Sequence, residues 1–231
     1  MITSSVVTVA SPATTADIQE HVVRMIDDIL TSLPSPESLS AEDRRSVIAR
    51  YTAVLEGNFI YWMTGAYLAV KSDAARAKII ENLREEVRDA HPLMMRRFAV
   101  AARAVPTEAD TLAVQQNLTR VRLFIGRLSP VATVVSMAFF EGFIQRFMPF
   151  LAELARLQGS SEMQYTDVHG VCDIEHTEEL YRALEAEMVL TDDAVGNVLQ
   201  GAEILRALVT DIVYGPRPAD RFDPKAAISV N

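Results

Sequence analysis

The sequence predicts an all-α fold, an up-down bundle of seven or eight helices, from two observations. Apolar residues recur at steps of three and four positions along most of the chain, which is the period of an α-helix with one buried face. One such series comprises Ile18, Val22, Ile26, Ile29 and Leu33. No stretch alternates apolar and polar residues over several positions, as a half-buried strand would. Helices joined by short connections pack as a bundle.

Turn-forming residues divide this helical pattern. Pro34-Ser35-Pro36 ends the first helix, and Ser129-Pro130 starts a long one, because proline suits the first turn of a helix and breaks its interior. Pro149 is expected to kink that long helix. The stretch from Arg44 to Lys71 is apolar on most faces and is expected to form a buried central helix. The expected helices cover residues 16–33, 40–71, 72–89, 92–104, 107–127, 129–157, 162–188 and 191–215.

The length of the chain favours a single domain. Its 231 residues, 49% of them apolar, can bury one sizeable core and are too few to make two domains the default. We expect one helical domain over residues 16–217, a mobile N-terminal tail over residues 1–15 and an irregular C-terminal tail over residues 218–231.

Charge and cysteine content exclude several functional classes. The chain has 22 basic and 31 acidic residues without a basic cluster, so a polyanion such as nucleic acid would be repelled. A membrane-spanning helix needs roughly 20 consecutive apolar residues, and the nearest approach, residues 131–144, contains Glu141. The N-terminus lacks the basic and then apolar pattern of a secretory signal. The single cysteine, Cys172, excludes an internal disulfide and fits a reducing compartment. We therefore expect a cytoplasmic protein that binds neither nucleic acid nor membrane.

The most specific chemical motif is His169-x₃-Asp173-x₂-His176. At about 100° per residue in an α-helix, Asp173 lies roughly 40° from His169, and His176 lies roughly 20° to its other side. Two imidazoles and a carboxylate on one stripe are a set of metal ligands arranged by the backbone. The alternative is a solvated polar face with a His–Asp pair, and apolar neighbours such as Val171 and Ile174 argue against it because they leave few exposed positions.

Glu141 is the second anomaly, because it lies in the most apolar stretch of the chain, residues 134–144. Burying an unpaired carboxylate is costly, so such a group is usually neutralised, paired or bound to a metal. An ion pair with an arginine such as Arg146 is the alternative to metal binding.

A third carboxylate and a third histidine occur where two expected helices meet. Glu85 and Glu86 precede His91-Pro92. Such acidic residues are common on solvated helix faces, and His91 would then only cap the next helix. Together with the other two sets, however, they resemble the ligands that dimetal carboxylate sites take from facing helices of a bundle. Oxygen and imidazole ligands without a thiolate favour iron or manganese over structural zinc.

These residues resemble the ligand set of the haem-oxygenase-like diiron oxidases and oxygenases, relatives by fold of haem oxygenase, thiaminase II and pyrroloquinoline-quinone synthase. The resemblance extends over roughly residues 45–190. It implies a seven-helix bundle that holds two Fe(II)/Fe(III) ions with O2 as co-substrate, and in which Glu141 is able to bridge the metals. The six ligands it implies are Glu86, His91, Glu141, His169, Asp173 and His176.

The chain departs from this family at one position. Family members commonly place the first glutamate seven residues before its histidine, where this chain has Arg84. The run 82–86 resembles the family's Asn-Leu-x-Asp-Glu run and so points to Glu86, with Glu85 as the alternative. Glu56, some thirty residues earlier, resembles an extra carboxylate ligand of some N-oxygenating members. Glu56 could equally well hydrogen-bond to one of the metal ligands or contact an ammonium group of the substrate.

The leading hypothesis is an O2-dependent non-haem diiron oxidoreductase that acts on a small molecule. By the resemblance, its substrate is an amino acid, an amine or a fatty acid, and the reaction is an N-oxygenation, a hydroxylation or an oxidative C–C or C–N cleavage in a biosynthetic pathway. An external reductant is compatible with this chemistry, and a homodimer is the base-rate expectation for its assembly.

Two other classes of function remain open at this stage. One is a metal-free hydrolase or cofactor-biosynthesis enzyme of the thiaminase II type, with Cys172 as the nucleophile, although a lone cysteine on a helix is more often a small core residue. The other is a non-catalytic interaction bundle or a metal-storage protein, which no feature of the sequence favours.

Overall fold

Helices build the part of the chain that the structure, a computed structural model, describes: residues 14–191 and 198–215. No strand occurs in these residues, so the prediction of an all-α bundle is confirmed. Residues 1–13 of the tail expected at 1–15, the whole tail expected at 218–231, and residues 192–197 at the expected start of the last helix lie outside the described residues, whereas Thr14 caps the first helix and Thr15 begins it. The helices are α1 (Thr15–Thr31), α2 (Ala41–Leu55), α3 (Asn58–Ala69), α4 (Asp73–Arg88), α5 (His91–Ala101), α6 (Glu108–Ile125), α7 (Pro130–Leu157), α8 (Gln164–Met188) and α10 (Gln200–Tyr214), with a 3-10 turn, η1 (Pro36–Ser38).

Side chains just outside the helices define several helix starts. Three helices begin with a capping box, in which a hydroxyl and a carboxylate three residues later each accept a hydrogen bond from the other's backbone N–H. The boxes are Thr14–Asp17, Ser40–Asp43 and Thr107–Asp110. The hydroxyl of Ser72 caps α4 in the simpler way, and α7 starts at Pro130 as the sequence predicts.

The central helix expected over residues 40–71 is interrupted, and on this point the sequence interpretation was wrong. α2 ends at Leu55 and α3 begins at Asn58. Between them Gly57 has a φ of 82°, a left-handed conformation that glycine adopts without a steric penalty and that no helix can continue through. The apolar residues on both sides of the break hid it in the sequence.

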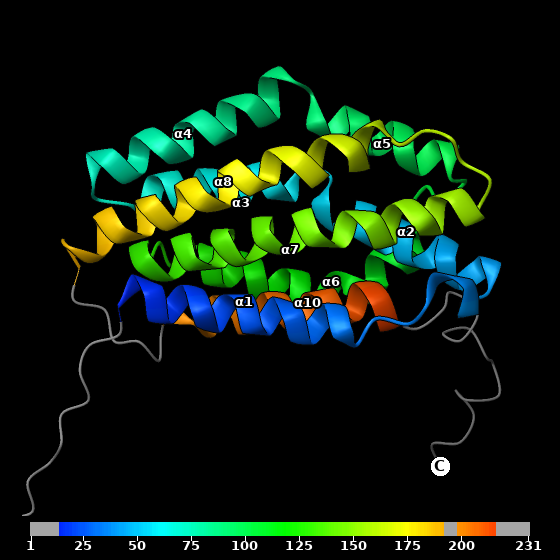
Figure 1. Cartoon of the computed structure of the whole chain (residues 1–231), viewed down its shortest axis with the longest axis horizontal. Coiled ribbons are helices and arrows are strands. Elements are labelled where there is room, and N and C mark those ends of the chain that lie inside the picture. The colour runs from blue at the N-terminus through cyan, green and yellow to red at the C-terminus, as the bar shows by residue number, and fades with distance from the viewer. Residues whose placement is uncertain (1–13, 192–197, 216–231) are drawn as a thin grey trace, which may run out of the picture.

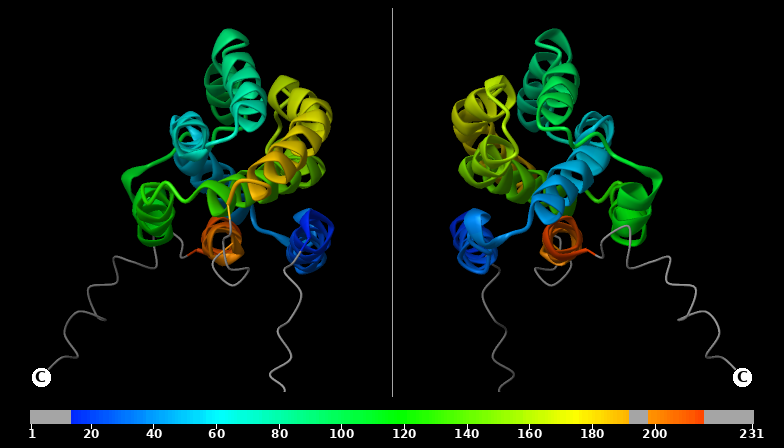
Figure 2. Two further views of the ribbon diagram at one scale, coloured as in Figure 1. Left: turned by 90° about the vertical axis from the view of Figure 1, so that its left-hand side faces the viewer. Right: turned by 90° about the vertical axis from the view of Figure 1, so that its right-hand side faces the viewer.

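α7 lies at the centre of the bundle, as the end-on views show (Figure 2). It packs against α1, α2, α3, α8 and α10, and one hydrophobic core takes side chains from every described α-helix. By length and composition α7 could also cross a membrane, but 89% of its most apolar window is buried inside the bundle. The core of the fold therefore accounts for its apolar character. Pro149 lies inside α7 and does not end it.

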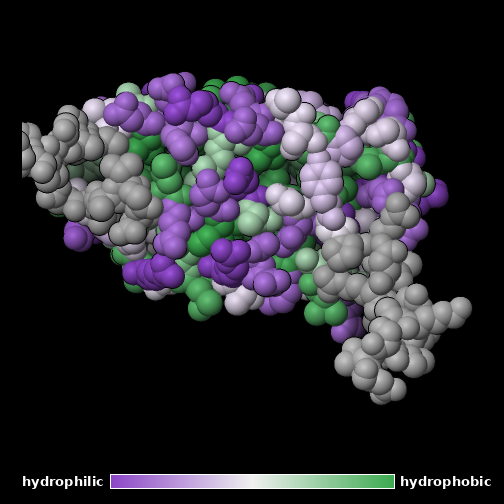
Figure 3. Space-filling view, turned by 90° about the horizontal axis from the view of Figure 1, so that it is seen from below, coloured by the Kyte–Doolittle hydropathy of each residue, from purple (hydrophilic) through white to green (hydrophobic). Residues whose placement is uncertain are grey.

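The other helices cover two sides of α7. α4 and α5 follow one another along the top of the bundle, above α8, whereas α1, α6 and α10 form the lower side (Figure 1). Seen from below, this lower side shows hydrophilic and hydrophobic residues interspersed (Figure 3). The six expected metal ligands all belong to α4, α5, α7 and α8, so the candidate site lies in the upper half of the bundle.

Candidate metal centre

The structure brings all six expected ligands into the interior of the bundle. Each is between 0% and 5% exposed, although all six are ionisable. Such burial is rare for charged side chains unless they are paired or bind a metal. They are Glu86 on α4, His91 on α5, Glu141 on α7, and His169, Asp173 and His176 on α8.

One group of ligands forms where α4 gives way to α5. Ala90 between the two helices has a φ of 55°, a left-handed conformation that turns the chain back on itself. As a result His91 Nδ1 lies 2.8 Å from Glu86 Oε1, although the two residues belong to different helices. The ring of His169 packs against that of His91, with centroids 4.5 Å apart. Ligand atoms of these three residues all lie within 4.8 Å of one another.

A second group forms one to two turns further along α8. His176 Nδ1 lies 3.8 Å from both Asp173 Oδ1 and Glu141 Oε1. Cys172 Sγ donates a hydrogen bond to Asp173 Oδ1 over 3.1 Å, and ligand atoms of Cys172, Asp173 and His176 also lie within 4.8 Å of one another. The spacing of the motif therefore places its members on one buried stripe, as the sequence predicts.

The prediction that few positions near this motif are exposed was wrong. Val171 and Ile174 are 71% and 50% exposed, on the solvent side of α8. α8 thus has one face open to solvent, and the motif occupies the other face.

Glu141 reaches the site from the central helix α7, and no arginine among the described residues pairs with it. Arg146, the alternative partner, pairs with Asp27 instead. Glu141 Oε1 accepts a hydrogen bond from Asn82 Nδ2 on α4 over 2.8 Å, and both side chains are buried. The sequence interpretation gave Asn82 no role; its position one helical turn before Glu86 on α4 was the available signal.

The site gathers carboxyl groups in the interior, where burial and their mutual repulsion disfavour the ionised form. Burial raises the pKa of Glu141 to about 7. Burial, and then the charge of Glu141, raise the pKa of Asp173 well above its usual range. Burial lowers the pKa of His91, but the hydrogen bond with Glu86 and the charges of the nearby carboxylates together outweigh burial and raise that pKa. Burial lowers the pKa of His169 to about 4, so this ring is neutral at physiological pH and its lone pair is available.

Two buried polar atoms of the expected ligands have no hydrogen-bond partner among the described residues: Asp173 Oδ2 and His176 Nδ1. Leaving such atoms unpaired in the interior costs free energy, whereas a metal ion would satisfy both and neutralise the carboxylates around them. Carboxylate and imidazole donors suit iron and manganese. The residues present therefore fit a metal centre of the type the sequence predicts.

The two candidate glutamates at the end of α4 have different positions. Glu86 is buried beside His91. The side chain of Glu85 is 38% exposed, and its Oε2 lies 3.0 Å from His176 Nε2 at the edge of the site. The geometry thus favours Glu86 over Glu85 as a ligand of the first group.

Glu56 lies outside both groups. It follows the last residue of α2, at the break before α3, and forms an ion pair with Arg96 of α5. A role for Glu56 in metal binding would require this ion pair to break.

Cys172 has the wrong electrostatics for a nucleophile. A thiolate is the reactive form of cysteine, but burial and the neighbouring Asp173 raise the pKa of the Cys172 thiol above its usual range. In addition, the thiol proton is held in the hydrogen bond to Asp173.

A small cavity of about 20 Å³ adjoins the first group of ligands only. Such a volume holds about one water molecule or a diatomic gas. Its remaining walls are apolar or aromatic, and it lies against the break between α2 and α3. The lining residues besides Glu86, His91 and His169 are Leu55, Phe59, Ile60, Pro92, Met95, Ile144 and Tyr165.

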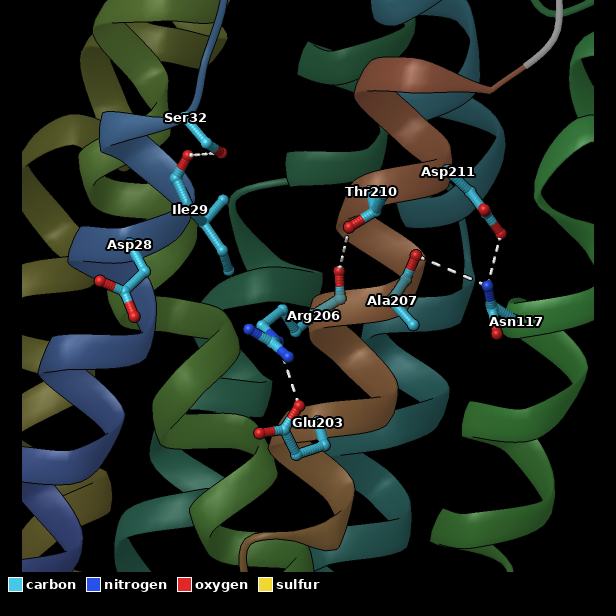
Figure 4. Close-up of a pocket in the computed structure, with 9 residues that line it drawn as sticks. All are labelled: Asp28, Ile29, Ser32, Asn117, Glu203, Arg206, Ala207, Thr210 and Asp211. Atoms are coloured by element: carbon cyan, nitrogen blue, oxygen red, sulfur yellow. Dashed lines mark hydrogen bonds and ion pairs between the residues drawn. The ribbon is translucent and has the colours of Figure 1, made fainter.

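A larger groove of about 660 Å³ lies away from the site, between α1, α6 and α10 (Figure 4). Within the groove, Arg206 donates a hydrogen bond to Glu203, and Asn117 donates one to Asp211. None of the expected ligands lines it.

Comparison with known proteins adds one match. Residues 47–208 match the model of a family described as iron-containing redox enzymes. This range contains both groups of ligands and Glu141. A search of curated proteins found no match.

Proposed function

The chain belongs to the family of iron-containing redox enzymes with the haem-oxygenase-like fold, and we propose that it is a non-haem diiron enzyme that uses O2 to oxidise a small molecule. The family supports an iron-dependent oxidoreductase. The number of irons and the use of O2 are part of the proposal.

The observation that carries the proposal is the pair of ligand groups with Glu141 beside them. One group is Glu86, His91 and His169, and the other contains Asp173 and His176. Glu141 contacts the second group at 3.8 Å, and the charge of Glu86 in the first group helps to raise its pKa. Two groups of donors with a carboxylate close to both are the arrangement in which helical bundles hold two metal ions.

Different side chains would bind each of the two irons. Glu86, His91 and His169 would hold one iron, Asp173 and His176 the other, and Glu141 would serve both. When bound, ferrous iron supplies electrons and open coordination positions for O2. Asn82 fixes one oxygen of Glu141 by its hydrogen bond, and the Tyr165 carbonyl fixes the ring of His169, whose Nδ1 lies 2.8 Å away. The apolar walls of the small cavity would leave room for only about one small molecule beside the first group.

The substrate belongs to the proposal as well. The residues and the resemblance they carry favour an amino-acid-like or amine substrate, oxidised by N-oxygenation, hydroxylation or C–C or C–N cleavage in a biosynthetic pathway. We further propose a cytoplasmic location, an external reductant when the reaction demands one, and assembly as a homodimer. The cavity beside the first group is too small for such a substrate as it stands, so binding would require the adjoining break between α2 and α3 to open.

Anaerobic loading with Fe(II) followed by rapid mixing with O2 tests the proposal. We expect the wild-type protein to consume O2 with a transient change in visible absorption. His176→Gln and Glu86→Gln should each lose this change, whereas Glu81→Gln, an exposed residue of α4, should keep it. Oxygen consumption that is equally fast in all three variants would refute the proposal.

A further inference from the structure

We infer that Glu85 is a positioning residue that holds the ring of His176 so that Nδ1, and not Nε2, is offered to the metal. This inference rests on the proposed function for the metal itself. The orientation of the ring is a property of the protein alone and can be tested without metal.

The contacts of His176 differ at its two nitrogens. Nε2 lies 3.0 Å from Glu85 Oε2, a hydrogen-bond distance. A carboxylate only accepts hydrogen bonds when ionised, so the ring places its proton on Nε2. Nδ1 is buried without a hydrogen-bond partner, 3.8 Å from Asp173 Oδ1 and Glu141 Oε1. The lone pair of Nδ1 therefore faces the two carboxylates that would share its metal.

The ring of His169 shows that the backbone of α8 does not by itself determine which ring nitrogen carries the proton. Its Nδ1 lies 2.8 Å from the backbone carbonyl of Tyr165, one turn earlier. A carbonyl oxygen can only accept, so His169 carries its proton on Nδ1 and leaves Nε2 free. Two histidines on one stripe of one helix are thus held in opposite tautomers, and only His176 depends on a side chain from another helix.

Glu85 is suited to this role by its place at the end of α4. Its side chain bridges from α4 to α8 at the edge of the site and remains 38% exposed. Its other oxygen lies 4.0 Å from Arg88. Because the side chain is partly in solvent, its removal leaves no enclosed cavity, so a structural defect would not mimic the loss of a positioning contact. Hydrogen bonds of this kind fix the tautomer and the orientation of metal-binding histidines.

The first arm of the test reads the tautomers directly in metal-free protein labelled with ¹⁵N at histidine. Two-bond ¹H–¹⁵N spectra at about pH 8, where ordinary imidazoles are neutral, distinguish Nε2–H from Nδ1–H. The chain has four histidines, so His169→Gln and His176→Gln suffice to identify the two signals that matter. We expect Nε2–H for His176 and Nδ1–H for His169.

Three variants then separate positioning from folding. Glu85→Ala should convert His176 to a mixture of tautomers and leave His169 unchanged. Glu85→Gln should retain most of the Nε2–H form, because the amide carbonyl still accepts the hydrogen bond. Glu81→Gln should have no effect on either ring. An unchanged His176 signal in Glu85→Ala would overturn the inference.

The second arm reads metal affinity with Co(II) as the probe. We expect Glu85→Ala to weaken one of two binding events about 10- to 100-fold, with a changed visible spectrum for that event only, and Glu85→Gln to weaken it less. Equal affinity at both events in Glu85→Ala would overturn the inference. If wild-type protein binds one Co(II) or none while the tautomers respond as expected, the diiron proposal fails and the positioning role stands.

Discussion

His169 and His176 lie on the same buried stripe of α8, and opposite nitrogens of their rings are held by described residues. His169 Nδ1 is held by the carbonyl of Tyr165 at 2.8 Å, whereas His176 Nε2 is held by Glu85 at 3.0 Å. The two histidines belong to different ligand groups. One helix can therefore serve two metal positions with a single motif.

Asn82→Ala should destabilise the metal-free protein by about 1–3 kcal/mol, because it leaves the buried Glu141 carboxyl without its hydrogen bond over 2.8 Å. Urea unfolding measures this loss. Metal loading should reduce this loss of stability, because a bound cation would stabilise the Glu141 carboxylate in place of the lost hydrogen bond. Asn117→Ala, which removes a hydrogen bond to Asp211 in the groove below, should show no such dependence on metal, and a metal dependence equal to that of Asn82→Ala would contradict the account.

Metal binding should release protons below about pH 7. The pKa of Glu141 is raised to about 7, so this carboxyl is largely protonated there and must ionise to bind a cation; the pKa of Asp173 is raised in the same direction. Apparent affinity should therefore rise with pH through this range. Calorimetric titration with Zn(II) in buffers of different ionisation enthalpy measures the release. Binding heats that are independent of the buffer at about pH 6 would show that metal binding releases no protons, which would contradict this prediction.

Cys172→Ala should keep both metal ions and the reaction with O2, because the Cys172 thiol has a raised pKa and donates to Asp173 rather than acting as a nucleophile. Metal analysis and oxygen consumption check this outcome. Hydrolysis of thiamin by the chelated wild-type protein, abolished in Cys172→Ala, would instead support the metal-free alternative.

Glu56→Gln and Arg96→Gln should each change stability by no more than about 1 kcal/mol, because the two residues form an ion pair that is largely exposed on the Arg96 side. Both variants should bind as many Co(II) ions as the wild type. If Glu56→Gln alone loses a metal ion, Glu56 is a ligand and its pairing with Arg96 must break on metal binding.

The part of the site that lies within one helix could be predicted from the sequence. The phase of His169, Asp173 and His176 follows from regular α-helical geometry, and α8 is unbroken from Gln164 to Met188. Glu141 was recognisable because a carboxylate in an apolar helix needs an explanation. The helical fold class was predictable for the same reason, since local periodicity carries it.

Features that depend on backbone breaks or on contacts between helices could not be predicted in this way. The left-handed Ala90 resets the helical phase between α4 and α5, so spacing could not choose between Glu85 and Glu86. The break at Gly57 was hidden by apolar residues on both sides. The bond from Asn82 to Glu141 joins α4 to α7 and is visible only in three dimensions.

The central claim is that one chain holds two metal ions, and anomalous scattering at the iron absorption edge from crystals grown anaerobically with Fe(II) tests it most directly. The account predicts two iron peaks per chain. One should lie among Glu86, His91 and His169, the other beside Asp173 and His176, with Glu141 between them. A single peak, or peaks remote from these six side chains, would contradict it.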